Sequence, residues 1–87
     1  MSLIERASYV SAIADDRDIE LLLRRYAAEN PGAADTLRGV VMFWLGLPPT
    51  PTNLTDAERV LQRLEGEGTL RSRLLGGSAL LWTVRAG

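Results

Sequence analysis

Arginine and glutamine side chains in the second half of the chain have the types and spacing that contact nucleic acid. Arg59 and Gln62 are three residues apart, so a helix across this segment would present both on one face. In the major groove of DNA, arginine pairs with guanine and glutamine with adenine. Arg63 adds a second cation to this face, which is therefore a candidate base-reading surface.

A second group of polar residues suits the phosphate backbone. Thr52, Asn53 and Thr55 stand where a helix is expected to begin, and N–H groups and hydroxyls at a helix N-terminus accommodate an anion. Residues of these types also serve simply as helix caps. Arginines that alternate along an expected strand either pair with phosphates or protect an exposed sheet edge. The predicted nucleic-acid-binding residues are Thr52, Asn53, Thr55, Arg59, Gln62, Arg63, Arg71 and Arg73.

The composition argues against catalysis. The chain contains no histidine, no cysteine and no lysine, whereas general acid–base catalysis at neutral pH favours histidine, lysine or a tuned carboxylate. Asp15, Asp16 and Asp18 lack the spacing of a calcium loop and are better explained as the start of a helix. We therefore expect no enzyme activity, no metal site and no cofactor.

The charge of the chain is divided unevenly. The net charge is −1, made of −3 over residues 1–35 and +2 over residues 36–87. Neutralisation of phosphates supplies most non-specific affinity for nucleic acid, so the total charge opposes DNA binding and the asymmetry favours it. Asp56 and Glu58, close to the candidate base-reading residues, would repel phosphate.

Targeting signals are not evident in the sequence. No apolar run approaches the roughly 18 residues of a transmembrane helix, and the first residues do not show a basic region followed by an apolar stretch. We expect a cytoplasmic protein with no membrane contact.

Apolar periodicity predicts a mainly α-helical fold with a C-terminal β-hairpin. We expect one domain over residues 1–87, with an N-terminal helical extension over 1–16, a helical core over 17–68 and a hairpin over 69–85. The first core helix should end near Asn30, and the second should run from Ala33 or Asp35 to about Gly46. The third has two possible starts, at Thr50 before Pro51 or at a capping box that begins with Thr55, and ends at Gly66 or Gly68.

The hairpin register follows from the requirement that one face be apolar. A two-residue turn at Gly76-Gly77 would place arginines opposite apolar residues, whereas a three-residue loop over 76–78 keeps the two sets apart. We therefore expect the pairs Leu74 with Leu80, Ser72 with Trp82, and Leu70 with Val84.

This order of elements is similar to a winged helix-turn-helix domain. Residues 44–48, Trp-Leu-Gly-Leu-Pro, resemble the end of the second helix and the turn in many bacterial regulators. Over residues 58–84 the chain resembles the Z-nucleic-acid-binding (Z-alpha) type of winged helix, which shares Arg59-Val60-Leu61, Leu64, Gly68, Leu70 and Leu81-Trp82. That family has an asparagine, a tyrosine and a proline pair where this chain has Glu58, Gln62 and Ser78-Ala79. The resemblance therefore implies the fold and, of the ligand contacts, Arg59 alone.

Two functions are compatible with this fold. The first is a small DNA-binding protein, a dimeric transcriptional regulator or phage-type control protein, whose third helix enters the major groove of double-stranded DNA while the wing follows the backbone. The alternative, favoured by the pI of about 5.3, is a protein-binding winged helix such as an adaptor, assembly subunit or mobile-element-encoded inhibitor. A continuous positive stripe from Arg59 and Arg63 to Arg71 and Arg73 favours DNA. A broken stripe with acidic patches and exposed Phe43 or Leu81 favours a protein partner.

The apolar run from Val40 to Leu47 indicates a helix that is either central in the core or covered by a partner. A chain of this length has a marginal core, and a homodimer formed by the first two helices would cover the run. The residues expected at this dimer or partner interface are Tyr9, Val10, Val41, Phe43 and Trp44.

Overall fold

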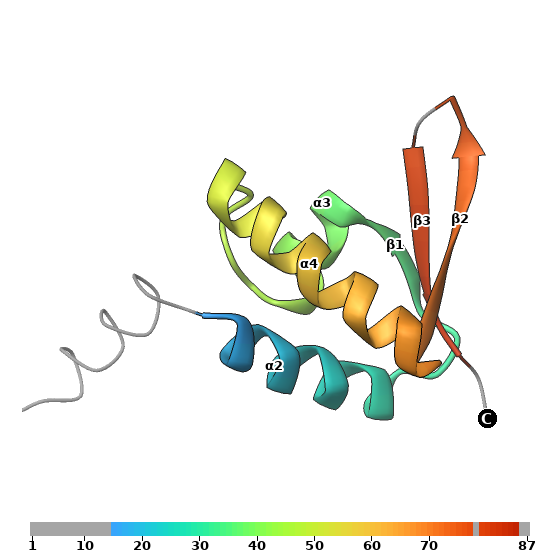
Figure 1. The fold of residues 1–87 in the computed structure, drawn as a ribbon, viewed down its shortest axis with the longest axis horizontal. Coiled ribbons are helices and arrows are strands. Elements are labelled where there is room, and N and C mark those ends of the chain that lie inside the picture. The colour runs from blue at the N-terminus through green and yellow to red at the C-terminus, as the bar shows by residue number, and fades with distance from the viewer. Residues whose placement is uncertain (1–14, 78, 86–87) are drawn as a thin grey trace, which may run out of the picture.

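The computed structural model describes residues 15–77 and 79–85. In these ranges, three helical segments pack against a small antiparallel sheet, so the prediction of a helix-rich chain with a C-terminal hairpin is confirmed (Figure 1). The elements are α2 (Asp16–Glu29), β1 (Ala34–Thr36), α3 (Leu37–Gly39) with the π-helix η1 (Val40–Trp44), α4 (Pro51–Glu67), β2 (Leu70–Gly76) and β3 (Ala79–Val84). The predicted helical extension, with Tyr9 and Val10, lies outside the described residues except at Asp15 and Asp16.

Helix α2 begins and ends where local chemistry predicts. The Asp15 carboxylate accepts a hydrogen bond from the backbone N–H of Asp18 (3.0 Å), which satisfies one of the donors at the helix start. Ile19 and Leu23 form its buried stripe. The helix stops at Asn30, whose side chain donates to the carbonyl of Tyr26 (2.9 Å), before Pro31 prevents continuation.

The prediction that the second core helix begins at Ala33 or Asp35 is wrong, because residues 34–36 form strand β1. This strand pairs with β3, placing Ala34 opposite Thr83 and Thr36 opposite Leu81. Thr36 then caps the short helix by accepting a hydrogen bond from Gly39 N–H (3.2 Å). The strand gains its hydrogen bonds from a partner nearly fifty residues away in the chain, and no local pattern indicates that partner.

Helix α4 begins at the first of its two predicted starts, Thr50, and not at Thr55. The Thr50 hydroxyl accepts a hydrogen bond from Asn53 N–H (3.1 Å), and Pro51 occupies the first turn. The Thr50 start is therefore confirmed, and Thr55 lies inside the helix. At the other end, Gly68 adopts a left-handed conformation (φ 87°) that residues other than glycine adopt at a cost.

The hairpin has the predicted register. Leu74 pairs with Leu80, Ser72 with Trp82, and Leu70 with Val84. The predicted loop over 76–78 is too long, because pairing continues to Gly76 and Ala79 across an irregularity between Leu74 and Gly76. The sheet order is β1-β3-β2, so β3 is its central strand and β2 forms one edge.

The core lies between α2, α4 and the inner face of the sheet. Tyr26 stacks on Trp44 with ring centroids 4.7 Å apart. Val41 (0% exposed) and Trp44 (7% exposed) belong to this core, so the prediction that they form a partner interface is wrong. They are buried because η1 turns them toward the protomer's own helices. The largest fully buried side chains are Trp82, Ile19, Leu23, Leu61, Leu64 and Leu70.

The cap at Thr50 gives a direct test of the α4 start. We expect Thr50→Ala to lower the free energy of unfolding by about 1 kcal/mol, because the first turn loses its side-chain acceptor. Thr55→Ala is the matched control and should change the stability by less than about 0.5 kcal/mol. Urea unfolding measures both values, and an equal loss in the two variants would contradict this assignment of the helix start.

Candidate functional site: helix α4, the hairpin and the groove between them

Arg59, the central residue of the predicted base-reading surface, is engaged by carboxylates of its own chain. Its Nη1 donates to both carboxylate oxygens of Asp16 at 2.8 Å, and its Nη2 donates to Asp56 Oδ1 at 3.1 Å. These bonds, first to Asp16 and then to Asp56, raise the pKa of the Arg59 guanidinium. The residue therefore joins α4 to the N-terminal end of α2.

Arg63 is held in a similar way one turn further along α4. Its Nη2 lies 2.6 Å from Glu20 Oε1 on α2. Arg24 contacts the same Glu20, with Nη2–Oε2 at 2.8 Å, and also Glu67 Oε1 at 2.7 Å. The hydrogen bonds from Arg24 and then Arg63 lower the pKa of Glu20. We call the residues that join these helices the α2–α4 ion-pair network: Asp16, Glu20, Arg24, Asp56, Arg59, Arg63 and Glu67.

The remaining predicted residues of α4 lie apart from this network. Thr52, Thr55 and Gln62 are exposed to solvent. Asn53 supports the helix start, because its Nδ2 donates to the carbonyl of Pro48 (2.9 Å). The outward face of α4 therefore carries polar side chains that are available to a ligand, while its two arginines are already paired.

Two carboxylates of α4 lie on the side of the helix that faces the hairpin. Glu65 Oε2 accepts hydrogen bonds from the backbone N–H and the hydroxyl of Ser72, at 3.0 and 2.9 Å. Glu58 lies further toward the N-terminal end of α4, beside residues of β3. The positive stripe expected from Arg59 to the hairpin arginines is therefore interrupted by acidic residues.

The outer face of the hairpin is basic. Arg71 and Arg73 are exposed on β2 opposite Thr83 and Leu81, so all four share one face of the sheet. Arg85 lies just after the end of β3, near the base of the hairpin, and its Nη1 donates a hydrogen bond to the carbonyl of Gly68 (3.3 Å). Within the described residues, no carboxylate lies within 4 Å of these three arginines. We call Arg71, Arg73 and Arg85 the hairpin basic face.

Arg85 is absent from the predicted site although it belongs to this face. It lines a shallow pocket of about 270 Å³ together with Arg71 and Thr83. Side-chain alternation along β3 could have indicated it, because Arg85 comes one residue after this strand and two residues after Thr83.

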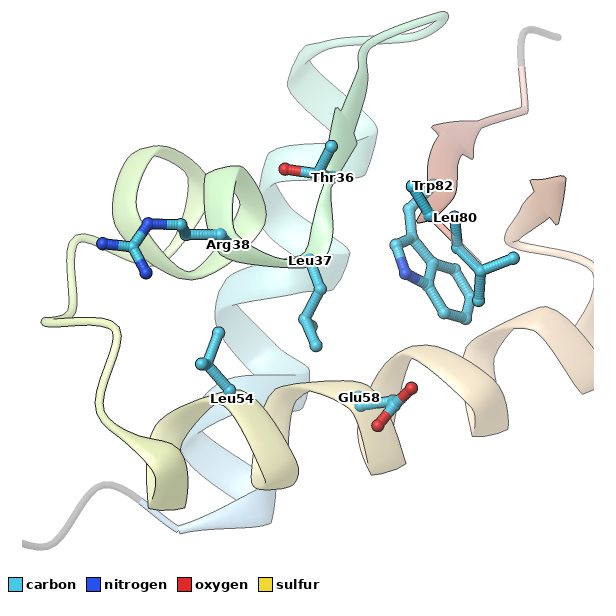
Figure 2. Close-up of a pocket in the computed structure, with 8 residues that line it drawn as sticks. Thr36, Leu37, Arg38, Leu54, Glu58, Leu80 and Trp82 are labelled. Atoms are coloured by element: carbon cyan, nitrogen blue, oxygen red, sulfur yellow. The ribbon is translucent and has the colours of Figure 1, made fainter. Parts of the chain in front are cut away.

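An apolar groove separates α3, α4 and β3. It has a volume of about 320 Å³ and is lined by Thr36, Leu37, Arg38, Leu54, Glu58, Ala79, Leu80 and Trp82. Figure 2 shows Leu37 and Leu54 on one side of this space and Leu80 and Trp82 on the other, with Glu58 on α4 between them. Sequence reasoning missed this groove because one wall depends on β1, which places α3 beside β3.

Further apolar side chains lie on the helical side of the molecule. Phe43 on η1 is 71% exposed and Met42 is 37% exposed. Of the five residues predicted for a partner interface, Phe43 is therefore the one that the described structure leaves accessible. Large exposed aromatic residues are typical of protein interfaces.

Acidic clusters that could hold a metal ion and long apolar helices are absent from the described part of the chain. Within the described ranges no three acidic residues cluster in a way that could hold a metal ion. Helices in the same ranges are too short or too polar to cross a bilayer.

The α2–α4 ion-pair network should make stability depend on acid pH through Glu20. Because the pKa of Glu20 is lower in the folded protein than its ordinary value of 4.5, its contribution is complete above 4.5 and is lost as the pH falls through the lower folded value. We expect Glu20→Gln to be less stable than the wild type at pH 7, with a deficit that shrinks below pH 4.5. Urea unfolding across this pH range measures the difference.

Glu29→Gln provides the control for this measurement. Glu29 makes only a long contact with Arg25 (3.9 Å), and both side chains are mostly exposed, so its replacement should alter stability little at any pH. A Glu20→Gln deficit that stayed constant from neutral to acid pH would contradict the role given to the carboxylate.

Comparison with known proteins gives no relative from which a function could be transferred. No protein-family model, no curated protein and no solved structure matches this chain. The geometry of α4, the hairpin and the groove therefore carries the functional proposal alone.

Proposed function

We propose that the chain is a small winged-helix module that binds another protein and does not read a DNA sequence. The winged-helix assignment is supported by the order of elements, in which β1 follows the first core helix and the hairpin follows α4. The sheet order β1-β3-β2 is compatible with it, because the hairpin then extends from one edge of the sheet as a wing. The fold alone does not assign the function, since one fold serves many functions.

The observation that carries the protein-binding proposal is the pairing of Arg59 and Arg63 with α2. To contact bases, these arginines would have to leave Asp16 and Glu20. Asp16 would then lose its partner on α4, and Glu20 would keep only Arg24 of its own helix. Glu58 and Glu65 add negative charge on the hairpin side of the helix. The net charge of −1 provides no compensating long-range attraction to phosphate.

Exposed apolar side chains supply the binding energy that this proposal requires. Phe43 is the largest of them and projects from η1, a segment whose other side is locked into the core by Val40, Val41 and Trp44. An aromatic residue on a rigid support is a typical centre of a protein interface. Such a module would act as an adaptor, an assembly subunit or a small inhibitor.

A second candidate function rests on the hairpin basic face. Three arginines without a nearby carboxylate in the described structure suit the phosphates of a nucleic acid backbone. Contacts of this kind depend strongly on salt and carry no sequence information by themselves. This candidate is therefore non-specific nucleic acid binding through the hairpin, with α4 uninvolved.

Binding to a random-sequence DNA duplex separates these functions. At about 200 mM salt we expect no saturable binding in fluorescence anisotropy, because the arginines of α4 are already paired with carboxylates. Binding at about 50 mM salt that disappears in Arg71→Ala/Arg73→Ala/Arg85→Ala and persists in Arg59→Ala/Gln62→Ala would support the second candidate. Tight binding that is lost in Arg59→Ala/Gln62→Ala would overturn the protein-binding proposal.

Phe43 provides the positive test of the same proposal. We expect an immobilised wild-type chain to retain a specific protein from extracts of its own cells, and Phe43→Ser to lose that protein. Phe43 is mostly exposed, so thermal unfolding should show the variant to be folded, and Arg17→Ser serves as a surface control that keeps the partner. Equal retention by wild type and Phe43→Ser would show that this surface is not the binding site.

A further inference from the structure

The inner face of the hairpin changes from buried to exposed along its length. Near its base, Leu70, Trp82 and Val84 are at most 2% exposed. Toward the tip, Leu74 on the same face is 65% exposed, and the neighbouring Leu75 is 55% exposed. Figure 1 shows the reason: the hairpin extends beyond the helices, so its tip has no helix to pack against. The tip therefore presents two leucines to solvent.

This exposed tip is continuous with the apolar groove. Leu80 lines the groove and is also the strand partner of Leu74. Leu37 and Leu54 form the opposite wall (Figure 2). An apolar cavity of about 150 Å³ holds a benzene molecule, so a groove of about 320 Å³ can hold a leucine side chain. The molecule thus carries a projecting apolar tip and, beside it, an apolar recess.

Charges on the walls of the groove complement one another. Glu58 is half-buried there, and Arg38 on α3 lies at the rim. Neither forms an ion pair within the described residues. In a twofold-symmetric interface each contact occurs twice with the roles exchanged. A surface that carries one unpaired cation and one unpaired anion is therefore suited to bind a copy of itself.

We propose that the occupant of the groove is the hairpin tip of a second copy of the chain. Leu74 of each protomer enters the groove of the other, against Leu37 and Leu54. Arg38 of each protomer pairs with Glu58 of the other, which neutralises the carboxylate as the groove is closed to water. The two hairpins pack against each other across a twofold axis, and this contact buries the exposed leucines of both tips.

Two other dimer arrangements agree less well with the structure. A dimer through the first two helices cannot use Val41 or Trp44, because both are buried in the protomer. Pairing between two β2 edges is opposed by the irregularity between Leu74 and Gly76, since such a bulge interrupts the row of backbone groups that a new strand would need. The proposed interface does not use Phe43, so it does not depend on the proposed function.

Sedimentation velocity of the full chain tests the interface. We expect a dimer across about 1 to 100 µM protein, and we expect Leu74→Glu to weaken it by about tenfold or more. Leu21→Glu is the matched control, because Leu21 is 62% exposed on α2 and lies outside the groove; this variant should remain dimeric. A wild type that is monomeric throughout, or a dimer that Leu74→Glu leaves intact, would overturn the proposal.

Charge exchange between two variants tests the pairing itself. Arg38→Glu alone and Glu58→Arg alone each place like charges in contact across the interface, so each should be mainly monomeric. An equimolar mixture should form a heterodimer, because one of its two contacts keeps the native Arg38–Glu58 pair and the other carries the same pair with its charges exchanged. Recovery in the mixture also shows that both variants are folded. A mixture that stays monomeric while the wild type dimerises would place the interface elsewhere.

Discussion

The burial of Trp82 on the central strand constrains most of the remaining structure. Trp82 is 1% exposed and lies between Asp35 of β1 and Ser72 of β2 in the sheet. Its side chain joins Leu61 and Leu64 of α4 in the single core cluster of the described residues. Because an indole this large can be covered only from several sides at once, β1, the hairpin and α4 must assemble together around it. The apolar groove lies beside Trp82, between α3, α4 and the part of β3 near the tip of the hairpin.

The arginines of the chain fall into two classes with different consequences. Arg24, Arg59 and Arg63 are bound by carboxylates on the facing helix, and their exposed pairs orient α2 against α4 while adding little stability each. Arg71 and Arg73 on β2 lie on one face of the sheet, and no carboxylate of the described residues lies within 4 Å of them. The same arginines without these carboxylates would form a continuous cationic surface. In this chain the acidic residues of α2 and α4 are placed so that they pair with Arg24, Arg59 and Arg63. The charge of each surface therefore depends on which arginines are paired with carboxylates, and not on how many arginines the chain contains.

The hairpin is buried at its base and exposed at its tip. Its base is part of the core, where Ser72 is tied to Glu65 of α4, and its tip carries leucines that the protomer does not cover. A support that is rigid at one end positions the other end for binding without a large loss of conformational entropy. The apolar surface of the tip and groove is separate from the exposed Phe43 on η1, so the proposed dimer and the proposed protein partner would use different surfaces.

Local sequence signals determined the end of α2 and the hairpin register, because capping and side-chain alternation act over a few residues. For α4 they gave two possible starts and two possible ends, and the structure selects Thr50 and Gly68. They also placed Arg71 and Arg73 on one strand face, whereas the exposure of Phe43 is known only from the structure. Strand β1, the burial of Val41 and Trp44, and the pairing of Arg59 with Asp16 were decided only by tertiary structure. Each depends on a partner far away in the chain, and an arginine that appears free in the sequence can be fully paired once another helix packs beside it.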